Sequence, residues 1–407
     1  MKHIHFILIF LLAASPFVYA GGEHGAGKEP LVSSWTSQHL NKVNELLANE
    51  KYVKAREKLD SLLSSLKGDK YETGLANQAY AYSYALQEDY KTAILYFEKA
   101  LPSLEASFNQ TQKTRYDLGQ LYMAEEHYEK AIRLLEAWLK HTEKKSAQVH
   151  ILLGNAYAQV GKNKQAIPHV RKAIQRRKEI GKEPQEPWYQ LLLSLYLDID
   201  NYQASVKLLP EMITLFPKTD IYWKQLGAMH LQLKDFKQGA AALEIAWQRG
   251  LLKKEAEVLR LAYLLLHLET PDKAARLLVS SLDSQYIESN EKHWRLLSDA
   301  WLLARETDKA VSALVKAASY ADSGNLNERV ARILVDQGEW QKAQDQLRLA
   351  LDKGDLKHPG NCYLLLGIAA TELDQTDQAR KAFTQASKHK KTKKSATQWL
   401  KLLDQSV

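Results

Sequence analysis

The chain has 407 residues, of which 45% are hydrophobic and 26% charged, and its formal net charge is +8. This composition supplies enough apolar material for a continuous core. The single cysteine, Cys362, excludes an intramolecular disulfide, so the fold must rest on packing, and we expect this thiol to be buried and unreactive.

Residues 1–20 have the pattern of a secretory signal peptide. Lys2 gives a positive start, residues 4–14 form an apolar segment, and Val-Tyr-Ala at the end makes a small-residue cleavage site. The apolar segment is short for a bilayer, and Pro16 interrupts it. We expect cleavage after Ala20 and export of a soluble protein, with an uncleaved N-terminal anchor as the alternative. No cysteine follows the cleavage point directly, which excludes a lipoprotein.

Residues 21–34 begin with a glycine-rich stretch that we expect to be a flexible tether. Gly22, Gly27 and Lys28 match the G-x4-G-K part of a phosphate-binding loop. However, Glu29 stands where such a loop has the Ser or Thr that binds magnesium, and no strand precedes it. Nucleotide binding is therefore not predicted.

From residue 35 onward, small residues recur at a nearly constant interval. Ten of them lie 33 to 39 residues apart: Ala55, Ala93, Ala131, Ala166, Ser205, Gly239, Ala274, Ala310, Ala343 and Ala379. A second row of Gly or Ala lies twelve residues before seven of these positions: Ala81, Gly119, Gly154, Gly227, Ala262, Ala331 and Gly367. Small residues are needed where two helix backbones approach closely, so the two rows predict about ten helix pairs.

The most complete repeat lies at residues 220–250, DIYWKQLGAMHLQLKDFKQGAAALEIAWQRG. Trp223, Leu226 and Gly227 form a W-x2-L-G start, and a small-large-small pattern follows in the second helix. This repeat resembles the tetratricopeptide repeat (TPR) family. The resemblance implies an all-α, right-handed superhelical solenoid of about ten helix-turn-helix repeats over residues 35–387.

Two features depart from the plain repeat. Pro168 falls in the second helix of the fourth repeat, soon after the turn at residues 161–163, so we expect the helix to tolerate it with a local distortion. Residues 388–407 combine a basic connection with an amphipathic segment that contains Trp399. Because a solenoid needs a polar-faced helix at its open end, we expect this segment to form a capping helix.

The sequence carries no recognised catalytic or cofactor motif. H-E-x-x-H, paired cysteines and G-x-S-x-G are absent, and the 13 histidines are scattered. His150, His230 and His293 lie on predicted helix faces, where we expect structural roles. We therefore predict no enzymatic activity, no cofactor and no metal site.

The first helices of a TPR array line its concave surface. Their inward-facing side chains are mostly polar here, which suits an extended peptide or a helix of another protein, although an ordinary solvated surface would have the same composition. The predicted partner-binding residues are Tyr116, Gln120, Asn155, Gln190, Ser194, Lys224, Arg295, Asp299, Glu328 and Arg332.

Basic residues gather in two places. One cluster comprises Arg171, Lys172, Arg176, Arg177 and Lys178, and the other comprises Lys388, Lys390, Lys391, Lys393 and Lys394. Nucleic acid, anionic lipid headgroups and an acidic partner are the contacts that such clusters suit, but nucleic acid is not an expected partner of an exported protein. An acidic protein surface and simple solubility are the two favoured explanations.

Three stretches carry a narrower resemblance: residues 164–174 (KQAIPHVRKAI), residues 291–310 (EKHWRLLSDAWLLARETDKA) and residues 351–405. They are similar to periplasmic TPR proteins that accompany TonB-type energy-transduction systems of gamma-proteobacteria. The resemblance implies a periplasmic accessory without a transmembrane anchor, which works with TonB, ExbB or ExbD in TonB-dependent uptake of iron chelates. The alternative is a periplasmic scaffold for assembly or export of an envelope polysaccharide or lipoprotein.

Overall fold

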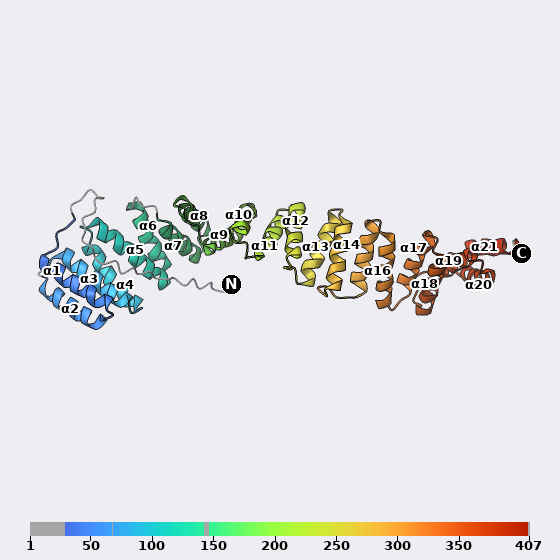
Figure 1. The fold of residues 1–407 in the computed structure, drawn as a ribbon, viewed down its shortest axis with the longest axis horizontal. Coiled ribbons are helices and arrows are strands. Elements are labelled where there is room, and N and C mark those ends of the chain that lie inside the picture. Colours follow the sequence, from blue (N-terminus) through green and yellow to red (C-terminus); the bar gives the residue numbers. More distant parts are fainter. Residues whose placement is uncertain (1–28, 67, 142–145, 406–407) are drawn as a thin grey trace. The chain divides into compact units, whose positions relative to one another are not determined.

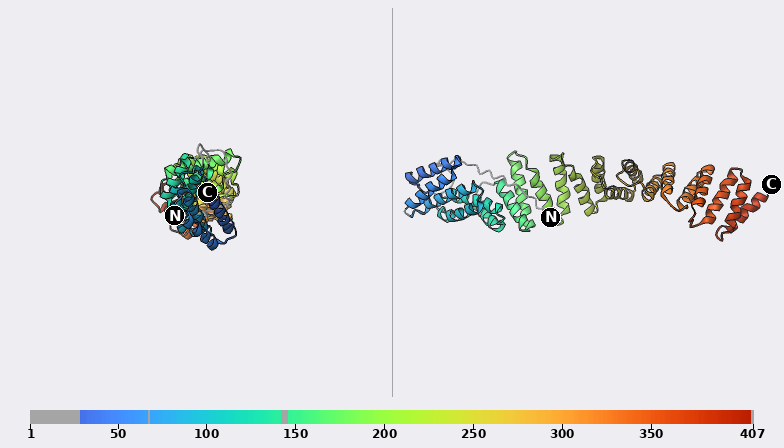
Figure 2. Two further views of the ribbon diagram at one scale, coloured as in Figure 1. Left: turned by 90° about the vertical axis from the view of Figure 1, so that its left-hand side faces the viewer. Right: turned by 90° about the horizontal axis from the view of Figure 1, so that it is seen from below.

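The structure is a computed structural model that describes residues 29–66, 68–141 and 146–405. The expected signal peptide, the G-x4-G-K sequence and most of the expected tether lie outside these residues. Within the described ranges every regular element is an α-helix (Figure 1), and two further views show the same coiled ribbons (Figure 2). The prediction of an all-α fold is confirmed. None of the described helices is both long and apolar enough to span a bilayer.

The helices of the described chain, in order, are α1 (Ser34–Ala48), α2 (Tyr52–Ser65), α3 (Lys70–Ala85), α4 (Tyr90–Ser103), α5 (Phe108–Ala124), α6 (Tyr128–His141), α7 (Ala147–Gln159), α8 (Asn163–Glu179), α9 (Glu186–Asp198), α10 (Tyr202–Leu215), α11 (Ile221–Gln232), α12 (Phe236–Gln248), α13 (Glu255–His267), α14 (Pro271–Asp283), α15 (Glu291–Leu303), α16 (Thr307–Tyr320), α17 (Asn325–Asp336), α18 (Trp340–Lys353), α19 (Pro359–Glu372), α20 (Thr376–Ser387) and α21 (Lys393–Gln405). Each odd-numbered helix from α1 to α19 is followed by its even-numbered partner, which gives the expected ten helix pairs.

The chain divides into two compact units, residues 1–208 (unit 1) and residues 209–407 (unit 2), with the boundary inside α10. In unit 1, each helix from α1 to α8 packs against the next one along the chain. The same neighbour-to-neighbour packing runs from α11 to α21 in unit 2. Each unit is therefore a row of helix pairs with a core shared between consecutive pairs.

Every helix pair turns through one residue with a positive φ. This residue lies two positions before the second helix in all ten pairs: Glu50, Glu88, Glu126, Gly161, Asp200, Lys234, Glu269, Arg305, Gly338 and Asp374. Only two of the ten are glycine, although a Cβ atom disfavours this left-handed conformation. The packing of the two helices therefore imposes the turn.

The ten small residues found from the sequence occupy one equivalent position. Each is the fourth residue of an even-numbered helix from α2 to α20, and all ten are buried. The small residues of the second row lie on the odd-numbered helices and face the even-numbered helix of the same pair. A Cβ added at Gly154 would lie 2.5 Å from Cγ2 of Val170, and one added at Gly367 would lie 2.5 Å from Cε1 of Phe383. Small residues are therefore required where the first helix meets the second.

Neighbouring pairs in unit 1 are linked by a recurring hydrogen bond from a tyrosine hydroxyl to a carboxylate. The three links are Tyr80 to Asp60, Tyr122 to Glu98 and Tyr157 to Glu136. Each tyrosine lies on the first helix of a pair, and each carboxylate lies on the second helix of the preceding pair. Burial, together with the Glu136 carboxylate, raises the pKa of Tyr157 to about 12, so this hydroxyl keeps its proton and donates at neutral pH.

Pro168 does not interrupt α8. It is the sixth residue of the helix, beyond the first turn, so the hydrogen bond that it cannot donate would have gone to the carbonyl of Lys164. The helix nevertheless continues to Glu179. The expected tolerance is confirmed, and any local distortion is too small to end or divide the helix.

The last helix, α21, covers the apolar side of α20 in unit 2. The Trp399 ring stacks on Phe383 with a centroid separation of 5.5 Å and an interplanar angle of 6°. Ala396 and Leu403 of α21 are buried in the same cluster. This packing leaves the lysine-rich side of α21 exposed, as in a capping helix.

Candidate functional site

All ten predicted partner-binding residues lie on odd-numbered helices, at two equivalent positions. They fall fifteen or eleven residues before the small residue that marks the second helix of their pair. We call seven of the ten residues at these positions in unit 1 the A-helix face, where the A-helix is the first helix of a pair: Gln78, Tyr82, Tyr116, Gln120, Asn155, Gln190 and Ser194. The remaining predicted residues belong to unit 2 and are described separately.

On the A-helix face, two amide side chains are fixed by contacts within their own helix. Gln120 Nε2 donates to the Tyr116 hydroxyl at 3.2 Å, and Asn155 Nδ2 donates to the Ile151 carbonyl at 3.0 Å. Gln190 Nε2 lies 3.4 Å from Oε1 of Glu186. Gln120 and Asn155 are half-buried, and no donor in the described chain bonds either of their side-chain oxygens. These two oxygens remain available as acceptors.

In unit 2, the five predicted residues are all charged and all paired. The pairs are Lys224 with Glu257, Arg295 with Glu291 at 3.5 Å, Asp299 with Arg329 at 2.7 Å and Arg332 with Glu328 at 2.9 Å. Glu328 differs from the expectation of an open surface residue, because it is only 5% exposed. Its carboxylate forms an ion pair with Arg332 and is largely shielded from solvent by the neighbouring helices.

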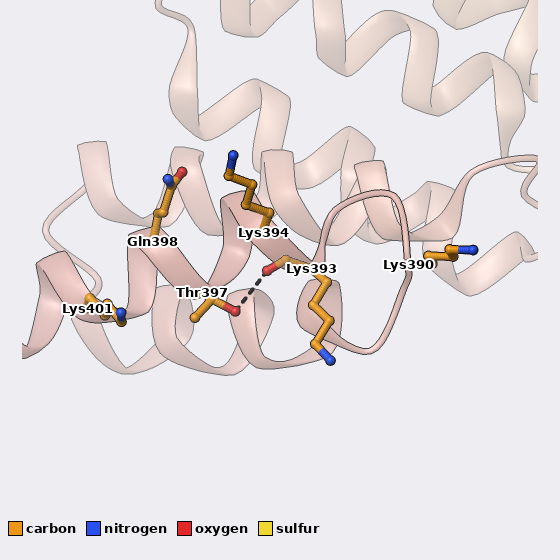
Figure 3. A pocket seen from close by; sticks show the side chains of 6 residues that line it. All are labelled: Lys390, Lys393, Lys394, Thr397, Gln398 and Lys401. Atoms are coloured by element: carbon orange, nitrogen blue, oxygen red, sulfur yellow. Dashed lines mark hydrogen bonds between the residues drawn. The ribbon is translucent and has the colours of Figure 1, made fainter.

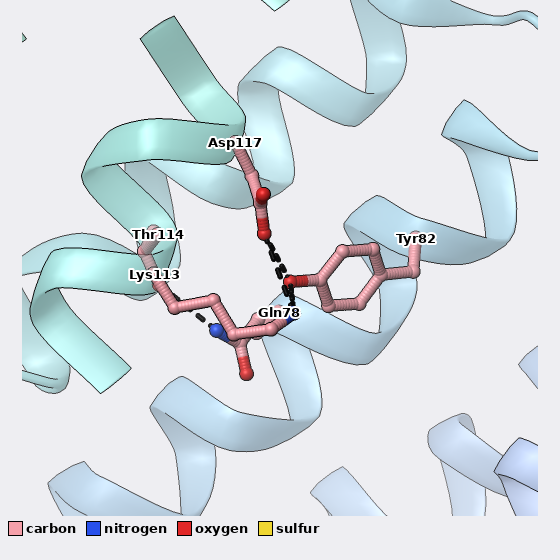
Figure 4. Close-up of polar contacts among 5 residues, drawn as sticks. All are labelled: Gln78, Tyr82, Lys113, Thr114 and Asp117. Carbon is pink, nitrogen blue, oxygen red and sulfur yellow. Dashed lines mark hydrogen bonds and ion pairs between the residues drawn. The ribbon is translucent and has the colours of Figure 1, made fainter. Parts of the chain in front are cut away.

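Sequence reasoning missed a polar cluster between α3 and α5 (Figure 4). The Tyr82 hydroxyl donates to the Asp117 carboxylate, and Lys113 Nζ donates to the same hydroxyl and lies 3.4 Å from the carboxylate. Gln78 Nε2 donates to Thr114 Oγ1 at 2.9 Å within the core. Tyr82 and Asp117 are 35 residues apart, about one repeat length, so the period brings them onto neighbouring helices. Gln78 and Tyr82 also occupy the two predicted positions, one repeat before Tyr116 and Gln120.

Burial controls the protonation of this cluster. It raises the pKa of the Tyr82 hydroxyl well above its ordinary value, and the Asp117 carboxylate adds to the effect. Burial also raises the pKa of Asp117, while Lys113 and the Tyr82 hydroxyl act in the opposite direction. The hydroxyl therefore stays protonated and bridges the ammonium and the carboxyl. The cluster fixes α3 against α5 and holds their polar faces in place.

The histidines singled out from the sequence make contacts of a structural kind. Nδ1 of His150 lies 3.2 Å from Nδ1 of His169, and burial lowers the pKa of His150 to about 4, helped by the positive groups nearby. His293 is buried, with Nδ1 2.8 Å from the Glu288 carbonyl. His230 lies with Nδ1 3.3 Å from Oδ2 of Asp235. No group of three or more metal-ligating side chains occurs in the part of the chain that the structure describes.

Cys362 is buried as expected. Its Sγ lies 3.5 Å from the Leu347 carbonyl, and burial raises the pKa of the thiol to about 12. The thiolate, which is the reactive form, is therefore scarce at neutral pH.

Comparison with known proteins places part of the chain in a family. Residues 113–179, which run from within α5 to the end of α8, match the family model described as tetratricopeptide repeat. No curated protein matches the chain.

Several solved repeat proteins align with this chain. A TPR protein from Parabacteroides merdae is 14% identical, with 74% of this chain and 98% of that chain covered and a TM-score of 0.38. MamA from Desulfovibrio magneticus is 19% identical, with 47% of this chain and 99% of that chain covered and a TM-score of 0.38. YrrB, described as a TPR protein with an unusual peptide-binding site, is 13% identical, with 46% and 89% covered and a TM-score of 0.36.

The family match lies inside unit 1 and covers most of α5 and all of α6, α7 and α8, which form two of the ten helix pairs. The same small-residue position and the same left-handed turn recur in the other eight pairs. Residues 113–179 thus match the tetratricopeptide repeat family, and the remaining pairs repeat the geometry of this matched part.

Proposed function

We propose that this protein is a non-catalytic scaffold that binds an extended segment of another protein along the A-helix face of unit 1. The observation that carries the proposal is the pair of fixed amide acceptors on consecutive repeats, Gln120 Oε1 and Asn155 Oδ1. Each amide group is oriented by a donor bond inside its own helix, and each oxygen is left without a donor in the described chain. Backbone N–H groups of an extended peptide supply such donors at regular intervals.

The proposal is tested by replacing these two amides. Gln120→Ala with Asn155→Ala removes both acceptors from half-buried positions and leaves the small-residue rows intact. The matched control is Gln165→Ala with Gln203→Ala, because both of these glutamines are exposed and lie on the even-numbered helices α8 and α10. We expect chemical crosslinking in intact cells to capture a partner with the wild type and the control, and several-fold less of it with the test variant. Equal capture by both variants would refute a role of the A-helix face.

We further propose that the scaffold is exported to the periplasm and serves a TonB/ExbB/ExbD system in uptake of iron chelates. The signal-like residues 1–20 and the narrower sequence resemblance support this proposal. Recovery of TonB, ExbB or ExbD in the crosslinked material would agree with it. Recovery of polysaccharide-synthesis or export components, with iron uptake unaffected by deletion, would reject it in favour of an envelope-assembly scaffold.

Unit 2 is tested by a second variant. Lys224→Ala, Arg295→Ala and Arg332→Ala remove the basic partners of three ion pairs. If unit 2 also contributes to binding of this partner, less of the partner should be captured with this variant. The export proposal has its own measurement, since N-terminal sequencing of the protein from the periplasmic fraction should begin at Gly21.

A further inference from the structure

Helix α21 and the connection before it carry a positively charged surface that has no role in the proposed function. Lys390, Lys393, Lys394 and Lys401 line a hollow of about 490 Å³ together with Thr397 and Gln398. We call these six residues the lysine surface (Figure 3). Among the described residues, none that lines the hollow carries a carboxylate or an aromatic ring.

The lysines of this surface lack the ion pairs that are common elsewhere in unit 2. Lys273, Lys309 and Lys342, for example, each lie within 3.1 Å of a glutamate oxygen. In contrast, no carboxylate of the described chain forms an ion pair with any of the four lysines that line the hollow. Their positive charge is therefore not neutralised within the described protein.

The backbone that carries the lysine surface is held firmly. A Cβ at Gly360 of α19 would lie 2.6 Å from Thr392 Oγ1, so the connection before α21 lies close against α19. The Thr392 hydroxyl is buried and donates to the Ala386 carbonyl at 2.7 Å. With the Trp399 stack on Phe383, these contacts fix the start and the middle of α21. The backbone that carries these lysines is thus held in place by packing and hydrogen bonding.

Two lysines of this surface lie at the end of α21 where positive charge is unfavourable. Lys393 and Lys394 are the first two residues of α21, at the end where unpaired backbone N–H groups already create positive potential. Cations at this end of a helix are unfavourable, because the helix dipole is positive there. A bound anion would remove this repulsion.

Four of the six lining residues are lysines. Their ammonium groups are compact, strongly hydrated point charges, and lysine is a common ligand of phosphate groups in proteins. Figure 3 shows the four ammonium groups pointing in different directions, and the Thr397 hydroxyl donates to the Lys393 carbonyl at 2.8 Å. Because the charges are spread, a ligand with several phosphoryl groups reaches more of them than a single phosphate does. We propose that the lysine surface binds a compact anion with several phosphoryl groups, either a free polyphosphate or the clustered headgroups of an anionic lipid surface.

The experiment uses the full chain and two probes. Sodium tripolyphosphate is titrated calorimetrically at low salt, and vesicles of phosphatidylglycerol with phosphatidylcholine are tested by cosedimentation. The test variant is Lys393→Gln, Lys394→Gln and Lys401→Gln. It keeps helix propensity because Gln and Lys have similar values, and it disturbs no core packing because all three side chains are exposed. The control is Lys273→Gln, Lys309→Gln and Lys342→Gln, which makes the same change in net charge. Circular dichroism verifies that both variants are folded.

We expect the wild type and the control to bind at least one probe, with affinity that falls as salt rises, and the test variant to bind at least about tenfold more weakly. Binding of tripolyphosphate identifies a free anion as sufficient, and binding of vesicles alone identifies a lipid surface. The proposal is overturned if neither probe binds, if the test variant binds as the wild type does, or if a polyglutamate peptide binds more tightly than tripolyphosphate. These outcomes are independent of partner capture through unit 1.

Discussion

Eight residues with a Cβ atom stand in the left-handed conformation at the turns between paired helices. This conformation costs such residues roughly 1–2 kcal/mol relative to their favoured regions. The cost recurs in eight pairs, which shows that the close contact of the two helices provides more stabilisation than the turn removes. Gly161 and Gly338 are the only two members of the row that avoid it.

We predict that Lys234→Gly stabilises the protein. Lys234 has a φ of 58°, and glycine adopts this angle without steric strain, although glycine also loses more entropy on folding. The expected gain is up to about 1 kcal/mol in the free energy of unfolding, measured by urea denaturation. The reciprocal change is Gly161→Ala, where a Cβ would meet no atom within 4 Å, so only the backbone conformation is disturbed. This second variant should lose about 1 kcal/mol, and a gain would contradict the account.

A second residue-scale prediction concerns acid. The pKa of His150 is lowered to about 4 from an ordinary value of 6.5, and burial lowers the pKa of the adjoining His169 as well, while the Glu136 carboxylate opposes the change at His169. A base with a lower pKa in the folded state binds protons more weakly there than in the unfolded state. Its neutral form therefore favours folding fully above about pH 6.5, and this contribution is lost as the pH falls toward 4.

The measurement is the melting temperature between pH 7 and pH 4. The wild type should lose stability across this range more steeply than the double variant His150→Gln with His169→Gln, which has no imidazole at this site. His358→Gln serves as the control, because His358 is exposed. Parallel pH profiles for the wild type and the double variant would show that the pair is not responsible.

At the scale of the helix pair, the close approach of backbones decides the effect of each glycine. Ordinarily, glycine to alanine in a helix gains about 1 kcal/mol. At Gly154 the new Cβ would lie 2.5 Å from Val170 Cγ2 and 3.4 Å from the Val170 backbone nitrogen. Valine has a stiff side chain, so the neighbour cannot move aside easily.

We therefore predict that Gly154→Ala destabilises unit 1 by about 1–3 kcal/mol despite its better helix propensity. Adding Val170→Ala should recover part of this loss, since it removes the methyl group that clashes. At Gly119 the nearest atom is the flexible end of Leu135, at 2.9 Å, so Gly119→Ala should cost less. Chemical denaturation of the three variants gives the comparison, and a larger loss at Gly119 than at Gly154 would contradict it.

Sequence reasoning succeeded for contacts that depend on spacing and failed for contacts that depend on side-chain placement. The rows that contain Ala166 and Gly154 were visible because close backbones require small residues at fixed offsets. The contact of His150 with His169 was not visible, because the period pairs the helices without fixing which side chains touch. Glu328 illustrates the same limit, since its position in the row is correct but its neighbours bury it.

At the scale of the molecule, stability depends on whether the apolar face of the last helix pair in a unit is covered. Residues 388–407 contain α21, which covers Phe383, and the side chain of Phe383 is fully buried. We predict that a chain ending at Ser387 has a lower melting temperature in unit 2 and binds more of a hydrophobic dye, because this apolar face becomes exposed. Leu402→Ala is the control, because Leu402 is 53% exposed and contributes little to the covered face. Unchanged melting of the shortened chain would show that α20 needs no cover.

The neighbour-to-neighbour packing within each unit also bears on how the protein responds to pulling. In unit 1, Ser107 and Asn109 at the start of α5 both donate to the Glu29 carboxylate, which ties the beginning of the described chain to the third helix pair. In unit 2, the helices with substantial contacts are adjacent or next but one in sequence. A force applied along unit 2 therefore acts on one helix interface at a time, and each interface can open independently of the others. Unit 2 should lengthen in small steps under low tension and shorten again when the tension is released, as a soft spring does.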